Sequence, residues 1–317
     1  MIYGVYAAIH NDRNIVSASQ SGGAFTALSD VILDMGGVVY GCVLDRTFRA
    51  VHMRADNKAQ RDLMRGSKYV QSDLGSTFSQ IKADLAAGRT VLFSGTPCQT
   101  AGLKKFIGDK GERLYCADII CHGVPSPAVW KSYLKWQQSR KRRRITDAVF
   151  RNKEGHGWHS HFERISFEDG TEVSSNVYAN VFYGHHPLRP SCFSCPFKSL
   201  ERQGDITIAD CWGIDKIAPE LDDNTGISLM LVNSQNGQEL LDKAGDNMVL
   251  QPIDIENVMQ PCLKEPFPEP EDRDVFWQEY RTKSFGYIAR KYGRYGADRT
   301  PKMLVKRAVG KIRRIIR

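Results

Sequence analysis

Short apolar runs alternate with segments of helical periodicity through the first 121 residues of the chain. The runs are rich in β-branched and aromatic residues, as strands are, and they span residues 3–9, 37–45, 90–95 and 113–121. The segments between them repeat apolar side chains every three or four positions, which predicts helices over residues 23–37, 76–89 and 98–106. This order predicts an α/β fold in which flanking helices cover a layered mixed sheet.

A different pattern follows the basic run of residues 140–144, a kind of run that is typical of a solvated surface. Antiparallel strands are predicted over residues 144–152, 162–174 and 176–184, with Asp169-Gly170 as a hairpin turn. Short strands return at residues 204–213 and 227–233, and the chain beyond Pro266 is predicted to be helical.

These patterns divide the chain into three predicted parts. An α/β region covers residues 1–144, and an inserted antiparallel β region covers residues 145–265. A peripheral helical extension covers residues 266–317 and ends in a basic amphipathic tail. The inserted region gives the α/β fold some α+β character.

The positive charge of the chain is concentrated at its C-terminus. The net charge is +8, yet residues 281–317 hold 13 Lys and Arg against one acid, which is +12, and the other 280 residues carry −4. Because the body is mildly acidic, we expect no nucleic-acid partner. No apolar run approaches the length of a spanning helix, and the start of the chain lacks a signal peptide pattern, so we expect a cytoplasmic protein.

The last 17 residues predict a basic amphipathic helix. Leu304, Ala308, Ile312 and Ile316 form one apolar stripe, and Lys and Arg fill most of the remaining positions. Helices of this type lie on anionic membrane surfaces or dock on acidic proteins. We therefore expect contact with one of these through residues 300–317, and a peripheral location at the inner face of the membrane if the contact is lipid.

Four of the eight cysteines have the positions of metal ligands. Cys98 and Cys121 each follow a predicted strand, where ligands gather in α/β sheets, and Cys192 and Cys195 form a C-x-x-C pair followed by proline. Four thiolates suit a cubane iron–sulfur cluster. The spacing alone leaves three readings equally open: a cluster, a zinc site that could include the adjacent pair His185-His186, or neither.

The four other cysteines have lesser predicted roles. Cys42 and Cys116 lie in apolar strands and are expected to be buried, and Cys262 is expected to be a loop thiol with no function. Cys211 follows a strand, and its role stays open.

Two small-residue stretches suit phosphate or nucleotide binding. Ser19, Ser21, Gly22 and Gly23 precede a predicted helix, whose N-terminal N–H groups bind anions. The second stretch combines small residues with a cation and an aromatic ring, and it consists of Gly66, Ser67, Lys68 and Tyr69. Each stretch could equally be an ordinary helix cap or turn, because neither has the Rossmann or P-loop spacing.

Taken together, these motifs resemble the coenzyme F420 hydrogenase/dehydrogenase beta-subunit family. The resemblance spans about residues 15–235 and rests on stretches that include SQSGGAFTAL, MRGSKYVQSDLG, SGTPCQ, DIICHGVPSPAVW and LRPSCFSCPFKSLERQGDITIADCWGI. It implies FAD beside the two small-residue stretches and Thr96, and one 4Fe-4S cluster on Cys98, Cys121, Cys192 and Cys195. Lys68 would stabilise the reduced flavin, and His122 would deliver a proton or donate to a cluster sulfur.

The implied function is that of a flavin-dependent iron–sulfur oxidoreductase. Electrons would pass between an external one-electron donor, the cluster, FAD and a small organic substrate, which could be sugar- or polysaccharide-related. The chain lacks the ferredoxin-like cysteine motif that many members carry, so the donor would be a separate ferredoxin or reductase. It also has Cys211 where the family usually has an aromatic residue, which would allow a fifth thiolate near the cluster.

Two alternatives belong to other classes of protein. One is an electron-transfer subunit with no substrate of its own that serves a partner enzyme. The other is a zinc-bearing binding module.

Overall fold

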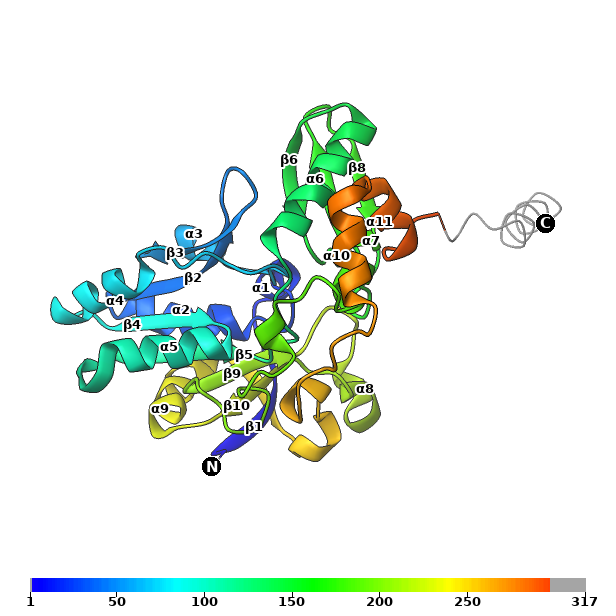
Figure 1. The fold of residues 1–317 in the computed structure, drawn as a ribbon. Coiled ribbons are helices and arrows are strands. Elements are labelled where there is room, and N and C mark those ends of the chain that lie inside the picture. Colours follow the sequence, from blue (N-terminus) through cyan, green and yellow to red (C-terminus); the bar gives the residue numbers. More distant parts are fainter. Residues whose placement is uncertain (1, 297–317) are drawn as a thin grey trace.

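The computed structural model describes residues 2–296 and contains one large sheet and one small sheet (Figure 1). The large sheet has the order β11-β1-β10-β9-β5-β4-β2-β3. Its strands are β1 (Gly4–His10), β2 (Val38–Leu44), β3 (Ala50–Ala55), β4 (Val91–Gly95), β5 (Leu114–Ile119), β9 (Ile206–Asp210), β10 (Ser228–Val232) and β11 (Met248–Pro252).

The centre of the large sheet is parallel and its flanks are antiparallel. Strands β2, β4, β5 and β9 pair in parallel, whereas β3, β10, β1 and β11 are added antiparallel. Parallel strands end at the same edge of a sheet, so the residues after β4, β5 and β9 lie together. This edge positions the functional site.

Helices cover both faces of this sheet, which explains the apolar runs in its strands. On one face, α2 (Ala24–Asp34) and α9 (Gln235–Ala244) pack with Val39 and Leu92. On the other face, α4 (Thr77–Ala86) and α5 (Pro97–Ile107) pack with Val38 and Phe93. Neighbouring residues of a strand face opposite sides, so a strand that is covered on both faces is apolar at every position.

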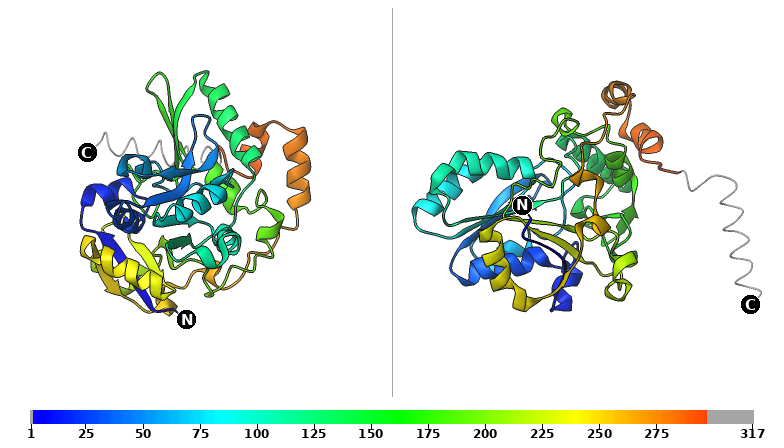
Figure 2. Two further views of the ribbon diagram at one scale, coloured as in Figure 1. Left: turned by 90° about the vertical axis from the view of Figure 1, so that its left-hand side faces the viewer. Right: turned by 90° about the horizontal axis from the view of Figure 1, so that it is seen from below.

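The small sheet consists of β6 (Ile145–Val149), β7 (Glu163–Phe167) and β8 (Glu172–Ser175). It shares a core rich in aromatic residues with α6 (Pro127–Lys141), α7 (Val177–Tyr183), α10 (Arg273–Thr282) and α11 (Phe285–Lys291). Figure 2 shows these elements as a layer beside the large sheet. The remaining short helices are α1 (Arg13–Ala18), α3 (Lys58–Asp62) and α8 (Ile214–Ile217).

The structure confirms the predicted α/β class, with its mixed sheet, flanking helices, small antiparallel sheet and C-terminal helices. The hairpin turn at Asp169-Gly170 is also confirmed, and Gly170 has a φ of 76° there. After the small sheet, the chain returns to the large sheet through β9, β10 and β11.

The strand predicted over residues 176–184 is wrong, because this segment forms α7. Its buried residues, Val177, Tyr178, Val181 and Phe182, fit a helical face as well as an alternating strand. Packing against β7 and α11 selects the helix despite the β-branched and aromatic composition.

No helix in residues 2–296 is long and apolar enough to cross a membrane. The predicted amphipathic helix at residues 300–317 lies outside the described residues.

Candidate functional site

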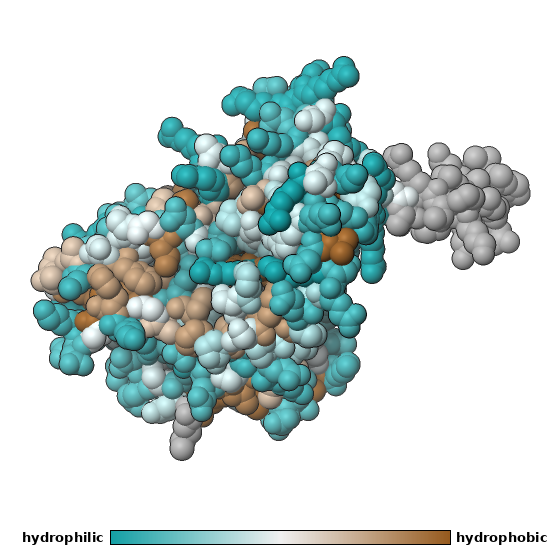
Figure 3. Space-filling model, in the orientation of Figure 1, coloured by the Kyte–Doolittle hydropathy of each residue, from teal (hydrophilic) through white to brown (hydrophobic). Residues whose placement is uncertain are grey.

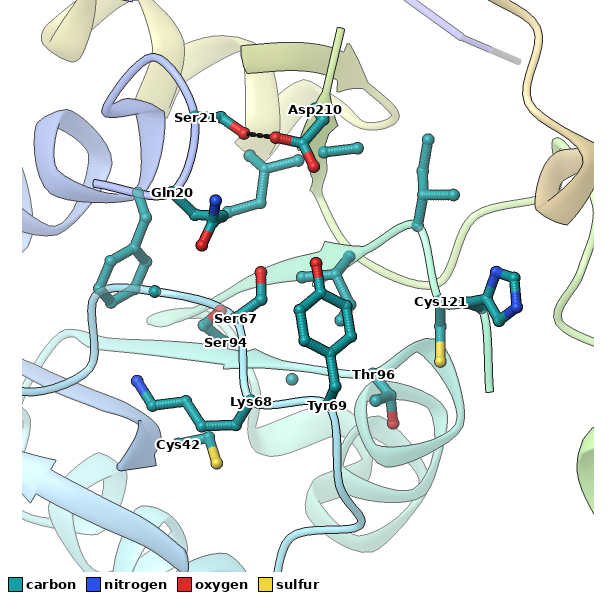
Figure 4. Close-up of a pocket in the computed structure, with 18 of the residues that line it drawn as sticks. Gln20, Ser21, Cys42, Ser67, Lys68, Tyr69, Ser94, Thr96, Cys121 and Asp210 are labelled. Carbon is teal, nitrogen blue, oxygen red and sulfur yellow. Dashed lines mark hydrogen bonds between the residues drawn. The ribbon is translucent and has the colours of Figure 1, made fainter. Parts of the chain in front are cut away.

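A cavity of about 320 Å³ lies at the carboxyl edge of the large sheet, and its walls include residues 64–70 and the segment ahead of α2. This volume is at the lower end of the range for small-molecule sites. Figure 4 shows Tyr69 in the middle of the view, with Ser21 and Asp210 on one side and Cys121 on another. The cavity is therefore built from segments that are far apart in the sequence.

Most of the predicted cofactor residues line this cavity. They are Ser19, Ser21, Gly23, Gly66, Ser67, Lys68, Tyr69 and Thr96, and His122 and Cys121 join them. Gly22 does not line the cavity, because its backbone packs against β1. A Cβ atom at Gly22 would lie 2.1 Å from the carbonyl oxygen of Ala8. Gly22 thus holds the loop against the sheet.

The N-terminus of α2 meets the cavity with its backbone uncovered. Gly23 is the N-cap with a φ of 90°, and no side chain caps the helix there. Ala24 and Phe25, the first residues of α2, also line the cavity. Free N–H groups at the start of an 11-residue helix make an anion-binding position, which suits a phosphate group.

The four candidate ligand cysteines form a cluster of thiols beside this cavity. Burial raises the pKa of Cys121 to about 12, and Cys98 and Cys192 raise it further. Burial also raises the pKa of Cys192, as do Cys195 and Cys98. A thiol that shifts the pKa of another lies near it. Cys121 also lines the cavity, so the thiol cluster and the cavity share this residue.

Single-ion sites and cluster sites place their thiolates at different spacings. Over residues 2–296, no group of three or more His, Cys, Asp or Glu converges tightly enough to hold one metal ion. Sulfur ligands of one zinc ion lie about 2.3 Å from it and therefore close to each other. A cubane binds each thiolate through a different iron atom, so its four ligands stand farther apart. All eight cysteines are free thiols.

Local structure explains how distant segments bring these thiols together. Cys98 sits at the start of α5, where Thr96 and Gln99 form a capping box, and Thr96 Oγ1 lies 3.2 Å from Cys98 Sγ. The segment after Cys121 pairs with the segment before Cys192 through Arg189 N to Val124 O, at 2.9 Å.

A buried ion pair fixes the chain on the other side of Cys195. Arg202 Nη2 lies 3.2 Å from Asp118 Oδ1, and both side chains are almost fully buried. The second oxygen of Asp118 accepts hydrogen bonds from the N–H groups of Gln203 and Gly204. The loop behind Cys195 is thereby joined to β5, three residues before Cys121.

Asp210, at the end of β9, organises a polar network on the opposite wall. Its carboxylate accepts hydrogen bonds from Ser21 Oγ and from Trp158 Nε1, the latter at 2.7 Å. Arg151 Nη1 lies 2.5 Å from Asp210 Oδ2, and its guanidinium stacks 4.9 Å from the ring centre of Trp212. Arg151 follows β6, so this pair connects the two sheets. Sequence reasoning missed Arg151, which is a single charged residue at the end of a strand.

Lys68 lines the cavity, but its ammonium group is engaged elsewhere. Nζ donates to the carbonyl oxygens of Leu63, Met64 and Arg65, at 3.3, 2.9 and 2.8 Å. These three bonds occupy all three N–H groups of the ammonium. Burial lowers the pKa of Lys68 to about 8. In this arrangement Lys68 holds the segment after α3.

Cys42 is predicted to lie in the core, yet it lies on the cavity wall near Lys68. Cys211, in contrast, is fully buried in a separate core with Trp158 and Ile214. Burial raises the pKa of Cys211 to about 12, with a further contribution from Asp210, and none of the four clustered thiols affects it. Cys211 therefore stands apart from the thiol cluster.

His122 lies in an aromatic cluster at the cavity wall. Its Nε2 is 2.8 Å from His185 Nε2, and its Nδ1 is 3.9 Å from the sulfur of Cys262, which also lines the cavity. Burial lowers the pKa of His122 to about 3, and His185 lowers it further. Both ring nitrogens of His122 thus already have a protein neighbour.

Tyr183 is a second polar group on this wall that sequence reasoning missed. It lines the cavity, it is half-exposed, and its hydroxyl lies 2.9 Å from His161 Nδ1. Burial lowers the pKa of His161 to about 4, so this ring is neutral near pH 7. The sequence pattern predicts a strand over Tyr183, whereas the residue lies on a helix. The direction of its side chain could therefore not be predicted from the sequence.

Comparisons with known proteins agree with this fold. A family model that describes the C-terminal part of the coenzyme F420 hydrogenase/dehydrogenase beta chain matches residues 88–258. No sequence among the curated proteins matches the chain. One similar solved chain comes from the xenon-derivatised F420-reducing NiFe hydrogenase complex of Methanosarcina barkeri. It has a TM-score of 0.55 and 19% identity, over 81% of this chain and 84% of that chain. This likeness supports the shared architecture.

Proposed function

Because the chain belongs to the coenzyme F420 hydrogenase/dehydrogenase beta-subunit family, we propose that it is a flavin-dependent iron–sulfur oxidoreductase. Electrons pass between an external one-electron donor, a 4Fe-4S cluster, FAD and a small organic substrate. One observation carries the proposal: a cluster of four thiols adjoins a cavity, and Cys121 belongs to both. A one-electron centre next to a two-electron cofactor is the arrangement that this chemistry requires.

The donor set fits a cubane cluster. Cys98, Cys121, Cys192 and Cys195 are free thiols; Cys98 and Cys192 both raise the pKa of Cys121, and Cys195 and Cys98 both raise that of Cys192. Such a cluster would supply one-electron steps. The Asp118–Arg202 pair and the capping box of α5 hold the segments that carry these cysteines.

The cavity residues fit FAD. The uncapped N-terminus of α2 at Gly23 would hold the pyrophosphate, as helix N-termini do in other nucleotide sites. Gly66, Ser67 and Tyr69 offer small side chains and an aromatic ring on the facing wall. FAD would supply hydride transfer to the substrate.

Two groups of the chain could hold a proton for the substrate. Tyr183 lines the cavity and its hydroxyl lies 2.9 Å from His161 Nδ1, so it is the better placed of the two. His122 has neighbours at both of its ring nitrogens, so its proposed role would require one of these contacts to open. The sugar- or polysaccharide-related substrate stays a prediction, and so does the cytoplasmic location.

A second candidate function is that of an electron-transfer subunit without a substrate of its own. It is favoured by the similar structure from Methanosarcina barkeri, which is that of a hydrogenase complex, because members of such an assembly act with partner proteins. An external ferredoxin or reductase is the expected donor in both cases. Cys98 is exposed, so one side of the proposed cluster would approach the surface where a donor could bind.

The test is cofactor analysis of the protein purified without oxygen. We expect about four iron atoms, four sulfides and one FAD per chain, with absorbance that bleaches on reduction. Single serine substitutions of the four clustered cysteines should each lower the iron content. Cys116→Ser is the matched control, because Cys116 is buried away from the thiol cluster in the large sheet. A colourless protein that holds zinc would overturn the proposal in favour of the binding module.

Turnover then separates the two redox candidates. Reduction of a small molecule by the isolated reduced protein supports an enzyme. If no compound in a panel of small organic acceptors reoxidises the reduced protein and only partner proteins do, the result supports the electron-transfer subunit.

A further inference from the structure

Helix α5 carries an exposed stripe that begins at one of the clustered thiols. Cys98 lies in the first turn of the helix, and Gly102, Lys105 and Phe106 follow it at helical spacing. All four residues are exposed, and Phe106 is 46% exposed although it is aromatic. The stripe therefore extends from the thiol cluster along the outside of the molecule.

Helix α4 widens this stripe into a partly apolar face. The ring centres of Phe78 and Phe106 lie 6.0 Å apart, so the two helices present neighbouring aromatic rings. Figure 3 shows apolar residues over α4 and α5, on the left side of the molecule. We call this surface the α5 face, and it consists of Phe78, Lys82, Cys98, Gly102, Lys105 and Phe106.

The fold itself does not require glycine at position 102. Gly102 lies in the middle of α5, where glycine is among the least favourable residues. A Cβ atom there would lie 3.6 Å from the Phe78 ring, which is an ordinary contact distance, so alanine would fit. The absent side chain instead allows the backbone of another protein to approach α5 closely, one turn from Cys98.

The α5 face is positive, whereas the body of the chain is acidic. Residues 77–107, from the start of α4 to the end of α5, contain four Lys and Arg and one acid, Asp84. Asp84 already pairs with Arg54, and Lys82 Nζ lies 5.3 Å from the ring centre of Phe106. The first 280 residues together carry −4. An acidic partner is therefore attracted to this face and repelled by most of the remaining surface.

We propose that the α5 face is the docking surface for a small acidic carrier protein of the ferredoxin type. The inference rests on the proposed function, because Cys98 would bring the 4Fe-4S cluster to this surface. The carrier would pass one electron to that cluster and leave oxidised by one electron. An apolar centre within a charged rim is the usual anatomy of a protein interface, and electron-transfer complexes bury small areas.

Two other occupants fit the face less well. A second copy of this chain would place two positive faces against each other, which charge disfavours. An anionic bilayer would satisfy the cations, but it gives no reason for a glycine beside an exposed thiol ligand. The position of the face next to Cys98 therefore favours a redox protein.

The test measures binding of an acidic bacterial ferredoxin to the full chain by calorimetry, after iron and FAD have been counted. We expect binding that weakens as salt is added, and little binding of a basic cytochrome c. Lys82→Gln/Lys105→Gln should raise the dissociation constant about tenfold, since two cations are removed. Lys135→Gln/Lys243→Gln is the matched control, because both lysines are exposed and lie on α6 and α9.

A second variant tests the close approach to the helix. Gly102→Glu adds bulk and a negative charge one turn from Cys98, so it should raise the dissociation constant at least about tenfold. Glutamate is a better helix former than glycine, so the fold should be retained, and circular dichroism checks this.

The outcomes separate this inference from the function on which it rests. Weaker ferredoxin binding in both face variants, with wild-type affinity in the control and full iron and FAD in all, supports the proposal. Equal weakening in the control would overturn it, and so would a cofactor-loaded wild-type protein that binds no ferredoxin. Face variants that lose only self-association or binding to anionic vesicles would also overturn it. A protein without iron would refute the proposed function, and this inference with it.

Discussion

Arg202 and Asp118 form an ion pair that is buried from solvent at both ends, with Nη2 and Oδ1 3.2 Å apart. The pair joins the loop behind Cys195 to the strand before Cys121. It therefore links two of the three segments that carry the clustered thiols.

Removal of one partner should destabilise the protein and the metal centre together. For Arg202→Met we expect a loss of about 3–5 kcal/mol in the free energy of unfolding, because the Asp118 charge would remain buried without its partner. Iron content after anaerobic purification should fall as the loop loosens. Glu168→Gln breaks an exposed pair and is the control, for which we expect no measurable change in the free energy of unfolding. A destabilised Arg202 variant with the iron content of the wild type would show that the ion pair does not support the metal centre.

Lys68 provides a test between a structural role and a direct role at the flavin. Its ammonium donates to three backbone carbonyls, two of them partly buried, so Lys68→Met should leave these acceptors without their donor and cost about 1–3 kcal/mol of stability. The reduction potential of the bound flavin should change little. A clear fall in that potential, measured by redox titration, would instead support the predicted contact between Lys68 and the reduced flavin.

Two partly buried histidines should make the protein sensitive to acid. Burial lowers the pKa of His52 to about 4 and that of His161 to about 4, whereas both groups titrate near 6.5 in the unfolded chain. Between these values the unfolded state binds more protons, so stability is present above pH 6.5 and is lost as the pH falls toward 4. We expect each histidine to contribute about 1–3 kcal/mol to this loss.

Urea unfolding at several pH values measures this effect. His52→Gln should flatten the decline between about pH 6.5 and pH 4.5 relative to the wild type. His156→Gln is the control, because His156 is exposed. If the free energy of unfolding of the His52 variant declines with pH as steeply as that of the wild type, His52 is not a source of the acid sensitivity.

Gly22 should tolerate no side chain. A Cβ atom there would lie 2.1 Å from Ala8 O and 2.7 Å from Ser228 N, and both are backbone atoms of paired strands. Gly22→Ala should therefore cost at least about 3 kcal/mol, since the strands would have to separate. Gly111→Ala, where the nearest atom is 3.6 Å away, should change stability by less than about 1 kcal/mol. Thermal unfolding of the two variants compares them directly.

Patterns in the sequence predict the central sheet well, because its strands are covered on both faces and are apolar throughout. Val38, Val39 and Tyr40 illustrate this, since each is fully buried against helices. The same reasoning fails at residues 176–184, where an apolar pattern suits either period and the neighbouring elements select the helix. Only tertiary packing could decide this element.

The candidate site divides in a similar way. Cysteine spacing and small-residue loops are local features, and they are enough to single out Cys121, Ser21 and Tyr69. Arg151 and Tyr183 carry no local signal, because their roles arise from contacts with Asp210 and His161 that lie 59 and 22 residues away. The spacing of residues along the chain does not predict long-range pairs of this kind.

The Arg151–Asp210 contact limits how the cavity can admit a ligand. A hinge motion between the two sheets would have to pull apart a guanidinium and a carboxylate that are shielded from water, and such a separation is energetically costly. The two cavity walls that this pair connects should therefore move little relative to each other. Entry and exit of a ligand would then depend on side-chain rotation at the rim of the cavity. The shape of the opening, more than a domain closure, would determine which ligands enter.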